Sequence, residues 1–169
     1  MELHEAMLKR RSIRKYTKEK VSKEDIETLL KYAMSGPSAC NRCPWEFYVI
    51  SNEEVIKEFY TSFRPMRIEA PLAIVVCGNM NETLKDDLSS YWIQDCSAAV
   101  ENILLGAVSL NLGTVWCGIT PQADKVQKTK EILSLDDHII PLGLVYVGHP
   151  DIEQEPRTQY KEEKVHYIE

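Results

Sequence analysis

Two short stretches of the sequence hold side chains that could do chemistry. The first is KRRSIRK, residues 9–15, where five of seven residues are basic in a chain of net charge −6. Arg10, Arg11 and Arg14 flank Ser12, and guanidinium groups bind phosphate through paired hydrogen bonds. The stretch indicates either an anion site or a solvated charge run. No glycine-rich motif of the P-loop or Rossmann type is present.

The second stretch is PSACNRCPW, residues 37–45, which contains the C-x-x-C pair Cys40 and Cys43. Such a pair can form a disulfide or supply half of a zinc site. No second Cys or His pair offers the remaining ligands, so we expect no metal site. The pair precedes a predicted strand, whereas thioredoxin-like motifs open a helix. A thiol redox or metal-binding protein using these two cysteines remains an alternative function.

Length and composition suit one domain over residues 1–169. The acidic balance disfavours general binding to nucleic acid. No apolar run approaches the roughly 20 residues that span a membrane, and the charged start, MELHEAMLKRR, lacks a secretory apolar region. We therefore expect a cytoplasmic protein with no membrane partner. Cys77, Cys96 and Cys117 stand singly in apolar surroundings and are predicted to be buried thiols.

The hydrophobic pattern predicts helices mixed with about four strands, which favours an α+β or three-layer arrangement. Ser22 should cap the second helix, which Gly36 and Pro37 end, and Ser51 should cap a short third one. The predicted helices cover residues 3–9, 22–35, 90–110 and 124–133, with a short one starting at residue 51. The predicted strands cover residues 46–50, 70–78, 114–118 and 141–148. Residues 149–169 form a polar tail that we expect to pack on a partner subunit.

Five segments in order resemble the FMN-dependent nitroreductase family over nearly the whole chain: RRSIRKY, PSACNRCPWEFYVI, QDCSAAVENILLGAVSLNLGTVWCGITPQ, IIPLGLVYVGHP and KVHY. The resemblance implies an α+β, three-layer fold with a central mixed or antiparallel sheet flanked by helices. It also implies an obligate homodimer with FMN at the subunit interface.

The resemblance implies which residues bind the cofactor. In the first segment one or two arginines would hold the FMN phosphate, and Arg14 would lie near the pyrimidine edge of the flavin. The second segment matches a loop that reaches the flavin of the other subunit, and the backbone near residue 117 would pass flavin N5. In the tail, Arg157 keeps a phosphate ligand where Gln159 cannot. The expected contacts are Arg10, Arg11, Ser12, Arg14, Pro37, Ser38, Ala39, Asn41, Cys117, Gly118 and Arg157.

The resemblance further implies an NAD(P)H-dependent oxidoreductase. NADH or NADPH would give a hydride to flavin N5, and the electrons would pass to a nitroaromatic, a quinone or a similar small acceptor by a ping-pong mechanism. Because the flavin carries the chemistry, no catalytic side chain is expected. A flavin-binding protein without turnover is a further alternative. A dehalogenating variant would need a lid, for which the stretch from Tyr60 to Trp92 is short.

Overall fold

Side-chain caps begin two of the helices, α2 (Lys23–Met34) and α3 (Glu53–Ser62), and the sequence predicted one of these two caps correctly. The computed structural model describes residues 2–63 and 68–169. Helix α2 starts as predicted, because the Ser22 Oγ accepts a hydrogen bond from the Asp25 N–H at 3.0 Å. The cap predicted at Ser51 is wrong. The Asn52 Oδ1 caps α3 instead, accepting bonds from the N–H groups of Glu54 and Val55, since an asparagine carboxamide fills this role as well as a hydroxyl does.

The other elements follow the predicted pattern to within two or three residues at each end. The longest is α4, which was predicted over residues 90–110. The helices are α1 (Leu3–Lys9), α2 (Lys23–Met34), α3 (Glu53–Ser62), α4 (Tyr91–Ser109) and α5 (Ala123–Leu133). The strands are β1 (Trp45–Ile50), β2 (Leu72–Asn79), β3 (Gly113–Gly118) and β4 (Ile139–Gly148). Within the described residues, short 3₁₀ turns cover Ala39–Asn41, Asp86–Leu88 and Glu162–Lys164.

The four strands form one antiparallel sheet in the order β1-β2-β4-β3. This arrangement confirms the predicted α+β class, and the sheet is antiparallel in all three strand pairs. β3 lies at one edge, where a single parallel bridge joins Ser12 to Thr114. An edge strand exposes unpaired backbone groups, and here the basic N-terminal segment covers part of that edge.

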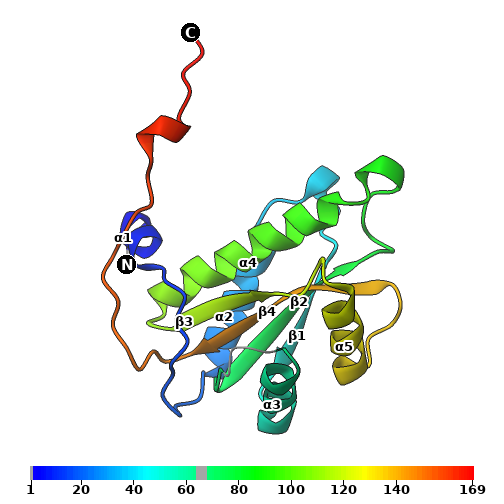
Figure 1. Ribbon diagram of the computed structural model, residues 1–169, viewed down its shortest axis with the longest axis horizontal. Helices are drawn as coiled ribbons and strands as arrows, with labels where there is room; N and C mark the ends of the chain where they lie inside the picture. The colour runs from blue at the N-terminus through cyan, green and yellow to red at the C-terminus, as the bar shows by residue number, and fades with distance from the viewer. Residues whose placement is uncertain (1, 64–67) are drawn as a thin grey trace.

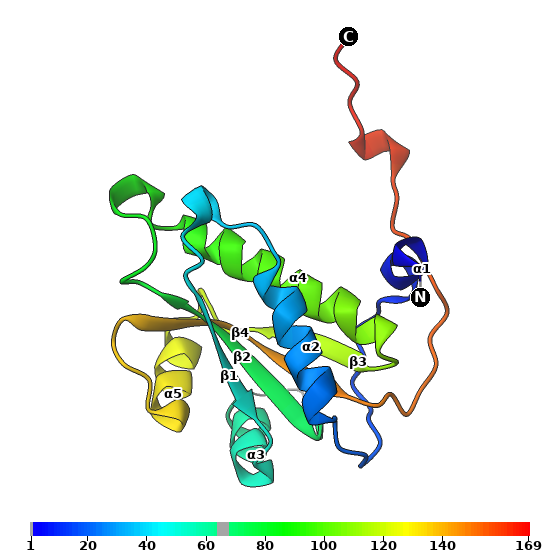
Figure 2. The same cartoon turned by 180° about the vertical axis from the view of Figure 1, so that it is seen from behind.

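Helices cover both faces of the sheet, which gives the three layers (Figures 1 and 2). Side chains alternate along the fully buried strand β2. Leu72, Ile74 and Val76 belong to the cluster that contains α2 and α4 residues. Ala73, Val75 and Cys77 belong to the cluster on the opposite face with α3 and α5. Trp92 is buried, and its indole occupies the space that a side chain at Gly78 would need.

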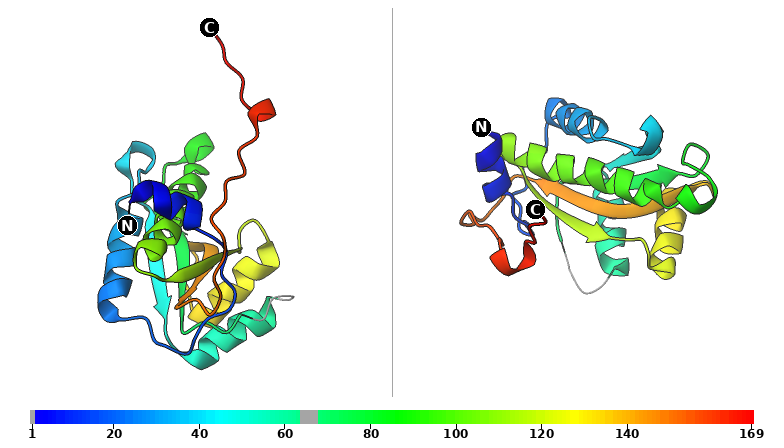
Figure 3. Two further views of the ribbon diagram at one scale, coloured as in Figure 1. Left: turned by 90° about the vertical axis from the view of Figure 1, so that its left-hand side faces the viewer. Right: turned by 90° about the horizontal axis from the view of Figure 1, so that it is seen from above.

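The tail leaves the body of the molecule after β4. Residues from about 150 pass α1 and then project away from the sheet and its helices (Figures 1 and 3). Large apolar side chains near its end are exposed, among them Tyr167 at 81% and Ile168 at 98%. None of the helices in the described ranges is long and apolar enough to cross a membrane.

Candidate functional site

The basic segment is fixed against the edge strand β3. The Ile13 N–H donates to the Thr114 carbonyl at 2.8 Å, and Ser12 forms its bridge with the same threonine. The Ile13 side chain is buried. The segment thus places its cations along β3, the strand that ends in Cys117 and Gly118. The basic segment and the end of this strand lie about a hundred residues apart in the sequence.

The structure separates the two arginines that the sequence treated alike. Arg10 and Ser12 line a pocket of about 250 Å³ together with Glu101, Leu104, Thr114, Val115 and Trp116. Arg11 and Ile13 line a different pocket, under the tail. The separation follows the alternation of side chains in extended backbone. Arg10, rather than Arg11, therefore shares a pocket with the Ser12 hydroxyl.

Two residues outside the expected cofactor contacts shape the Arg10 pocket. Glu101 on α4 places a carboxylate oxygen 3.8 Å from the Arg10 Nε. Trp116 is 37% exposed, and its indole lies over Gly143, where a Cβ atom would overlap the ring. The only sequence signal for Glu101 was a charge within an otherwise apolar helix, and nothing tied it to Arg10. The pocket combines a cation, a hydroxyl and an exposed aromatic plane.

The far end of β3 is electropositive and open. Burial raises the pKa of the Cys117 thiol, and the charges of Arg14 and Lys125 oppose that shift. Cys117 is half-buried rather than buried as predicted, because its side chain packs at the margin of the core on the α3 and α5 side. Gly118 is exposed, and a Cβ atom there would meet only the Thr120 carbonyl, at 4.0 Å. A planar group could approach this backbone closely.

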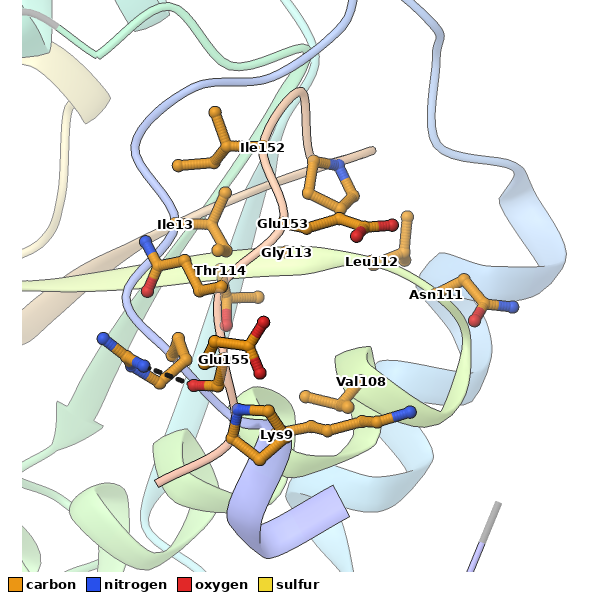
Figure 4. A pocket seen from close by; sticks show the side chains of 14 residues that line it. Lys9, Ile13, Val108, Asn111, Leu112, Gly113, Thr114, Ile152, Glu153 and Glu155 are labelled. Atoms are coloured by element: carbon orange, nitrogen blue, oxygen red, sulfur yellow. Dashed lines mark hydrogen bonds between the residues drawn. The ribbon is translucent and has the colours of Figure 1, made fainter. Parts of the chain in front are cut away.

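The tail pocket, of about 430 Å³, lies between the end of α1, the end of α4 and the start of the tail (Figure 4). Val108 and Leu112 form apolar walls, and Lys9, Glu153 and Glu155 bring charges of both signs. The Arg11 Nη1 donates to the Glu155 carbonyl at 2.6 Å. Arg11 thereby holds the tail in place.

Arg157 lies on the same stretch of tail as Glu155. Its N–H donates to the Leu8 carbonyl of α1 at 3.1 Å, and its side chain is exposed. The tail therefore brings the backbone of Arg157 next to Leu8, near the end of α1. Leu8 is two residues before Arg10 in the sequence.

The loop with Pro37, Ser38, Ala39 and Asn41 lies at the opposite end of α4 from α1 (Figures 1 and 2). Its Ala39 N–H bonds to Asp95 in the second turn of α4, whereas Arg10 and Ser12 line a pocket with Glu101 and Leu104 farther along the helix. No hydrogen bond or ion pair among the described residues joins this loop to the basic segment of the same chain.

The loop is wound through backbone conformations that ordinary residues rarely adopt. Cys40, Asn41 and Cys43 have φ values of 51°, 53° and 50°, each of which costs on the order of 1 kcal/mol or more. The Ser38 Oγ accepts a bond from the Cys43 N–H at 2.9 Å, and the Asp95 Oδ1 accepts one from the Ala39 N–H at 2.8 Å. Sequence reasoning missed Asp95 because a lone acidic residue near a helix start has no distinctive spacing.

The two loop cysteines are free thiols, with Cys40 exposed and Cys43 half-buried. The Cys43 Sγ lies 3.6 Å from the Ser38 Oγ and 3.7 Å from the Asn41 carbonyl oxygen. Within residues 2–63 and 68–169, His, Cys, Asp and Glu side chains form no group of three or more that could hold a metal ion.

Comparison with known proteins identifies the family of this chain. The family model for the nitroreductase family matches residues 7–66 and 60–149. A protein of Methanothermobacter thermautotrophicus, provisionally named an NADH dehydrogenase/NAD(P)H nitroreductase, is 37% identical over 98% of this chain and 86% of its own length. An iodotyrosine deiodinase of Thermotoga neapolitana is 27% identical over 96% and 95% of the two chains.

Solved structures share the fold. A crystal structure with the same provisional name from Parabacteroides distasonis has a TM-score of 0.92 and 35% identity, covering 98% of this chain and 96% of that one. A nitroreductase of Desulfovibrio desulfuricans, also provisionally named, in complex with FMN has a TM-score of 0.84 and 26% identity, covering 99% and 96%. The order of the elements, the antiparallel sheet and the sequence similarity agree: this chain belongs to the nitroreductase family.

Proposed function

We propose that this chain is an FMN-dependent NAD(P)H oxidoreductase whose flavin site lies along β3. The observation that carries the proposal is the alignment of Arg10, Ser12, Arg14 and the open backbone at Gly118 on one edge of the sheet. Family membership and the FMN complex of the Desulfovibrio desulfuricans relative support it.

The chemistry of these groups fits FMN. A guanidinium and a hydroxyl suit the phosphate end, and the exposed glycine leaves room for a ring. Thr114, which pairs with Ser12, and Gly118 are four residues apart on one strand, about 13 Å. That span suits a mononucleotide laid along the edge with its phosphate near Arg10. Arg14 would place its charge near the pyrimidine edge of the ring, and Arg157 would add a second cation to the phosphate end.

The site takes one of its parts from a second subunit. The loop with Ser38 and Asn41 bonds to α4 at Asp95 rather than to the basic segment, and as the family resemblance implies, in a homodimer it would reach the flavin held by the partner. Exposed apolar residues on α1, Leu3 at 65% and Met7 at 55%, support a subunit contact there. The projecting tail, residues 149–169, would pack on the partner as well.

Bound FMN supplies the redox chemistry, taking a hydride from NADH or NADPH and passing electrons to a nitroaromatic, a quinone or a similar acceptor. The protein binds and orients the reactants, and its cations near Cys117 favour negative charge at that end of the site. Donor and acceptor would use one opening above Gly118 in turn. Double-reciprocal plots of initial rate against one substrate, at several fixed concentrations of the other, should therefore give parallel lines. This is the pattern of a ping-pong mechanism.

An anaerobic absorbance titration tests the proposal. Purified protein with FMN should show a flavin spectrum that bleaches on addition of NADH or NADPH, and the colour should return with a quinone or nitroaromatic. If added FMN separates completely from the protein on a desalting column, the result would contradict FMN as the cofactor. Retained FMN that neither nucleotide bleaches would point instead to a flavin-binding protein without turnover.

The loop thiols favour a second candidate function only if they are required for turnover. Cys40 is exposed and free, so iodoacetamide should reach it in the folded protein. Alkylated protein that keeps its rate of NAD(P)H oxidation would exclude a thiol redox function for the pair. Loss of turnover in both Cys40→Ser and Cys43→Ser, with FMN still bound, would support that function.

A further inference from the structure

Asp95 is the one carboxylate that the fold buries within the described part of the chain, with 6% of its surface exposed. It lies in the second turn of α4. Burying an ionised carboxylate removes its hydration, and such groups are ordinarily paired with a cation. No lysine, arginine or histidine of the described residues forms an ion pair with Asp95. Its side chain bonds instead to the Ala39 N–H at 2.8 Å.

The partner of this carboxylate lies in the middle of the strained loop. Ala39 stands between Ser38, whose Oγ closes the loop on the Cys43 N–H, and Cys40 and Asn41 with their positive φ values. Strained backbone of this kind persists only where the surrounding structure determines it from several sides. Removing one fixed point lets the loop relax toward ordinary dihedral angles.

We propose that Asp95 is a positioning residue for the flavin site, holding the Ala39 amide so that Ser38 and Asn41 face the cofactor. The proposal rests on the proposed function, in which this loop contacts FMN. Two other bonds act outside these loop residues, one just after them and one in the last turn of α2. The Arg42 Nε donates to the Glu82 carbonyl at 2.8 Å, and the Asn102 Nδ2 donates to the Tyr32 carbonyl at 3.0 Å. Of these three anchors, only Asp95 bonds to one of the four loop residues expected at the flavin.

The test compares three variants by their affinity for FMN and for riboflavin, which lacks the phosphate. Asp95→Ala removes the acceptor and should weaken both flavins at least tenfold, because the loop is expected at the ring rather than at the phosphate. Asp95→Asn keeps an oxygen acceptor and should bind both within about threefold of the unaltered protein. Asn102→Ala, the matched control, removes a similar bond from α4 and should lower stability in urea without weakening either flavin.

Amide hydrogen exchange supplies a second readout, independent of the cofactor. The Ala39 N–H should exchange much faster in Asp95→Ala than in Asp95→Asn or Asn102→Ala. Should Asp95→Ala fail to fold, Ala39→Pro removes the same bond from the other side. The extended Ser38, at φ −139° and ψ 153°, has the conformation that a residue before proline adopts.

Unchanged affinity for both flavins in Asp95→Ala, or equal weakening in Asn102→Ala, would overturn the proposal while leaving the proposed function intact. An unaltered protein that binds neither flavin would overturn the proposed function, and this inference with it. The two failures are therefore distinguished by the unaltered protein alone.

Discussion

The N–H of Ile13 donates to the carbonyl of Thr114 at 2.8 Å, and the neighbouring Gly113 packs directly under the Ile13 side chain. This contact joins the basic segment to the strand that carries Gly118. It turns two separate sequence motifs into one candidate site, so its disruption should affect stability and cofactor binding together.

Gly113→Ala should lower the free energy of unfolding by about 1–3 kcal/mol. A Cβ atom there would lie 2.9 Å from Cβ, Cγ1 and Cγ2 of Ile13, which are the stem of a stiff, buried side chain. Urea denaturation measures the loss, and fluorescence titration should show weaker FMN binding. Gly118→Ala is the matched comparison: its Cβ atom has room, so it should weaken FMN binding at unchanged stability. Equal stability of Gly113→Ala and the unaltered protein would contradict the contact.

Arg10→Gln should weaken FMN binding by roughly 10- to 100-fold, the effect of losing a charged hydrogen bond of about 1.5–3 kcal/mol. Riboflavin binding should hardly change, since riboflavin has no phosphate for Arg10 to bind. Arg11→Gln provides the control, because Arg11 bonds to the Glu155 carbonyl under the tail. The assignment of the phosphate to Arg10 is wrong if Arg11→Gln has the larger effect on FMN.

Glu101→Gln, unlike Arg10→Gln, should strengthen FMN binding, by up to about fivefold. The Glu101 carboxylate lies 3.8 Å from the Arg10 Nε and would repel a phosphate there, and exposed ion pairs are worth about 0.2–1 kcal/mol. Glu27→Gln, which breaks an exposed pair with Lys31 on α2, should leave affinity unchanged. Weaker FMN binding in Glu101→Gln would show that the carboxylate binds the cofactor rather than opposing it.

Stability should fall as pH rises above about 8.5. Burial raises the pKa of Cys96 to about 12, and it raises the pKa of Cys77 as well. The folded protein therefore keeps protons that the unfolded chain releases above the ordinary thiol pKa, and each such thiol lowers the free energy of unfolding by up to about 1.4 kcal/mol per pH unit. Urea unfolding between pH 8 and 9.5 measures the slope. Cys96→Ala should make the decrease of stability with pH less steep, with the contribution of Cys77 remaining. An unchanged slope in this variant would contradict the mechanism.

Patterns that depend on neighbours in the sequence predicted most of the fold. Ser22 marked the start of α2, and the apolar pattern marked the strand that became β2. The cap of α3 was misplaced by one residue because Ser51 and Asn52 are both good caps, and only the path of the chain selects between them.

Long-range contacts explain what the sequence could not show. Asp95 and Glu101 are ordinary charged residues on a helix, and their partners, Ala39 and Arg10, lie 56 and 91 residues away. Arg10 and Arg11 are chemically identical, and only their alternate orientation beside β3 distinguishes them. Residues 64–67, part of the stretch judged too short for a lid, lie outside the described residues. The described residues of that stretch contain β2 and one 3₁₀ turn.

Mixed dimers test the central claim that each flavin site combines β3 of one subunit with the loop of the other. Chains carrying Arg10→Gln and Asp95→Ala are co-expressed with different tags, and the mixed dimer is purified and titrated with FMN. If the site is shared, both lesions fall in one site and the other is intact, so one FMN per dimer should bind with unaltered affinity. If each site belongs to a single chain, every site carries one lesion, and no FMN should bind with unaltered affinity. That result would contradict the account.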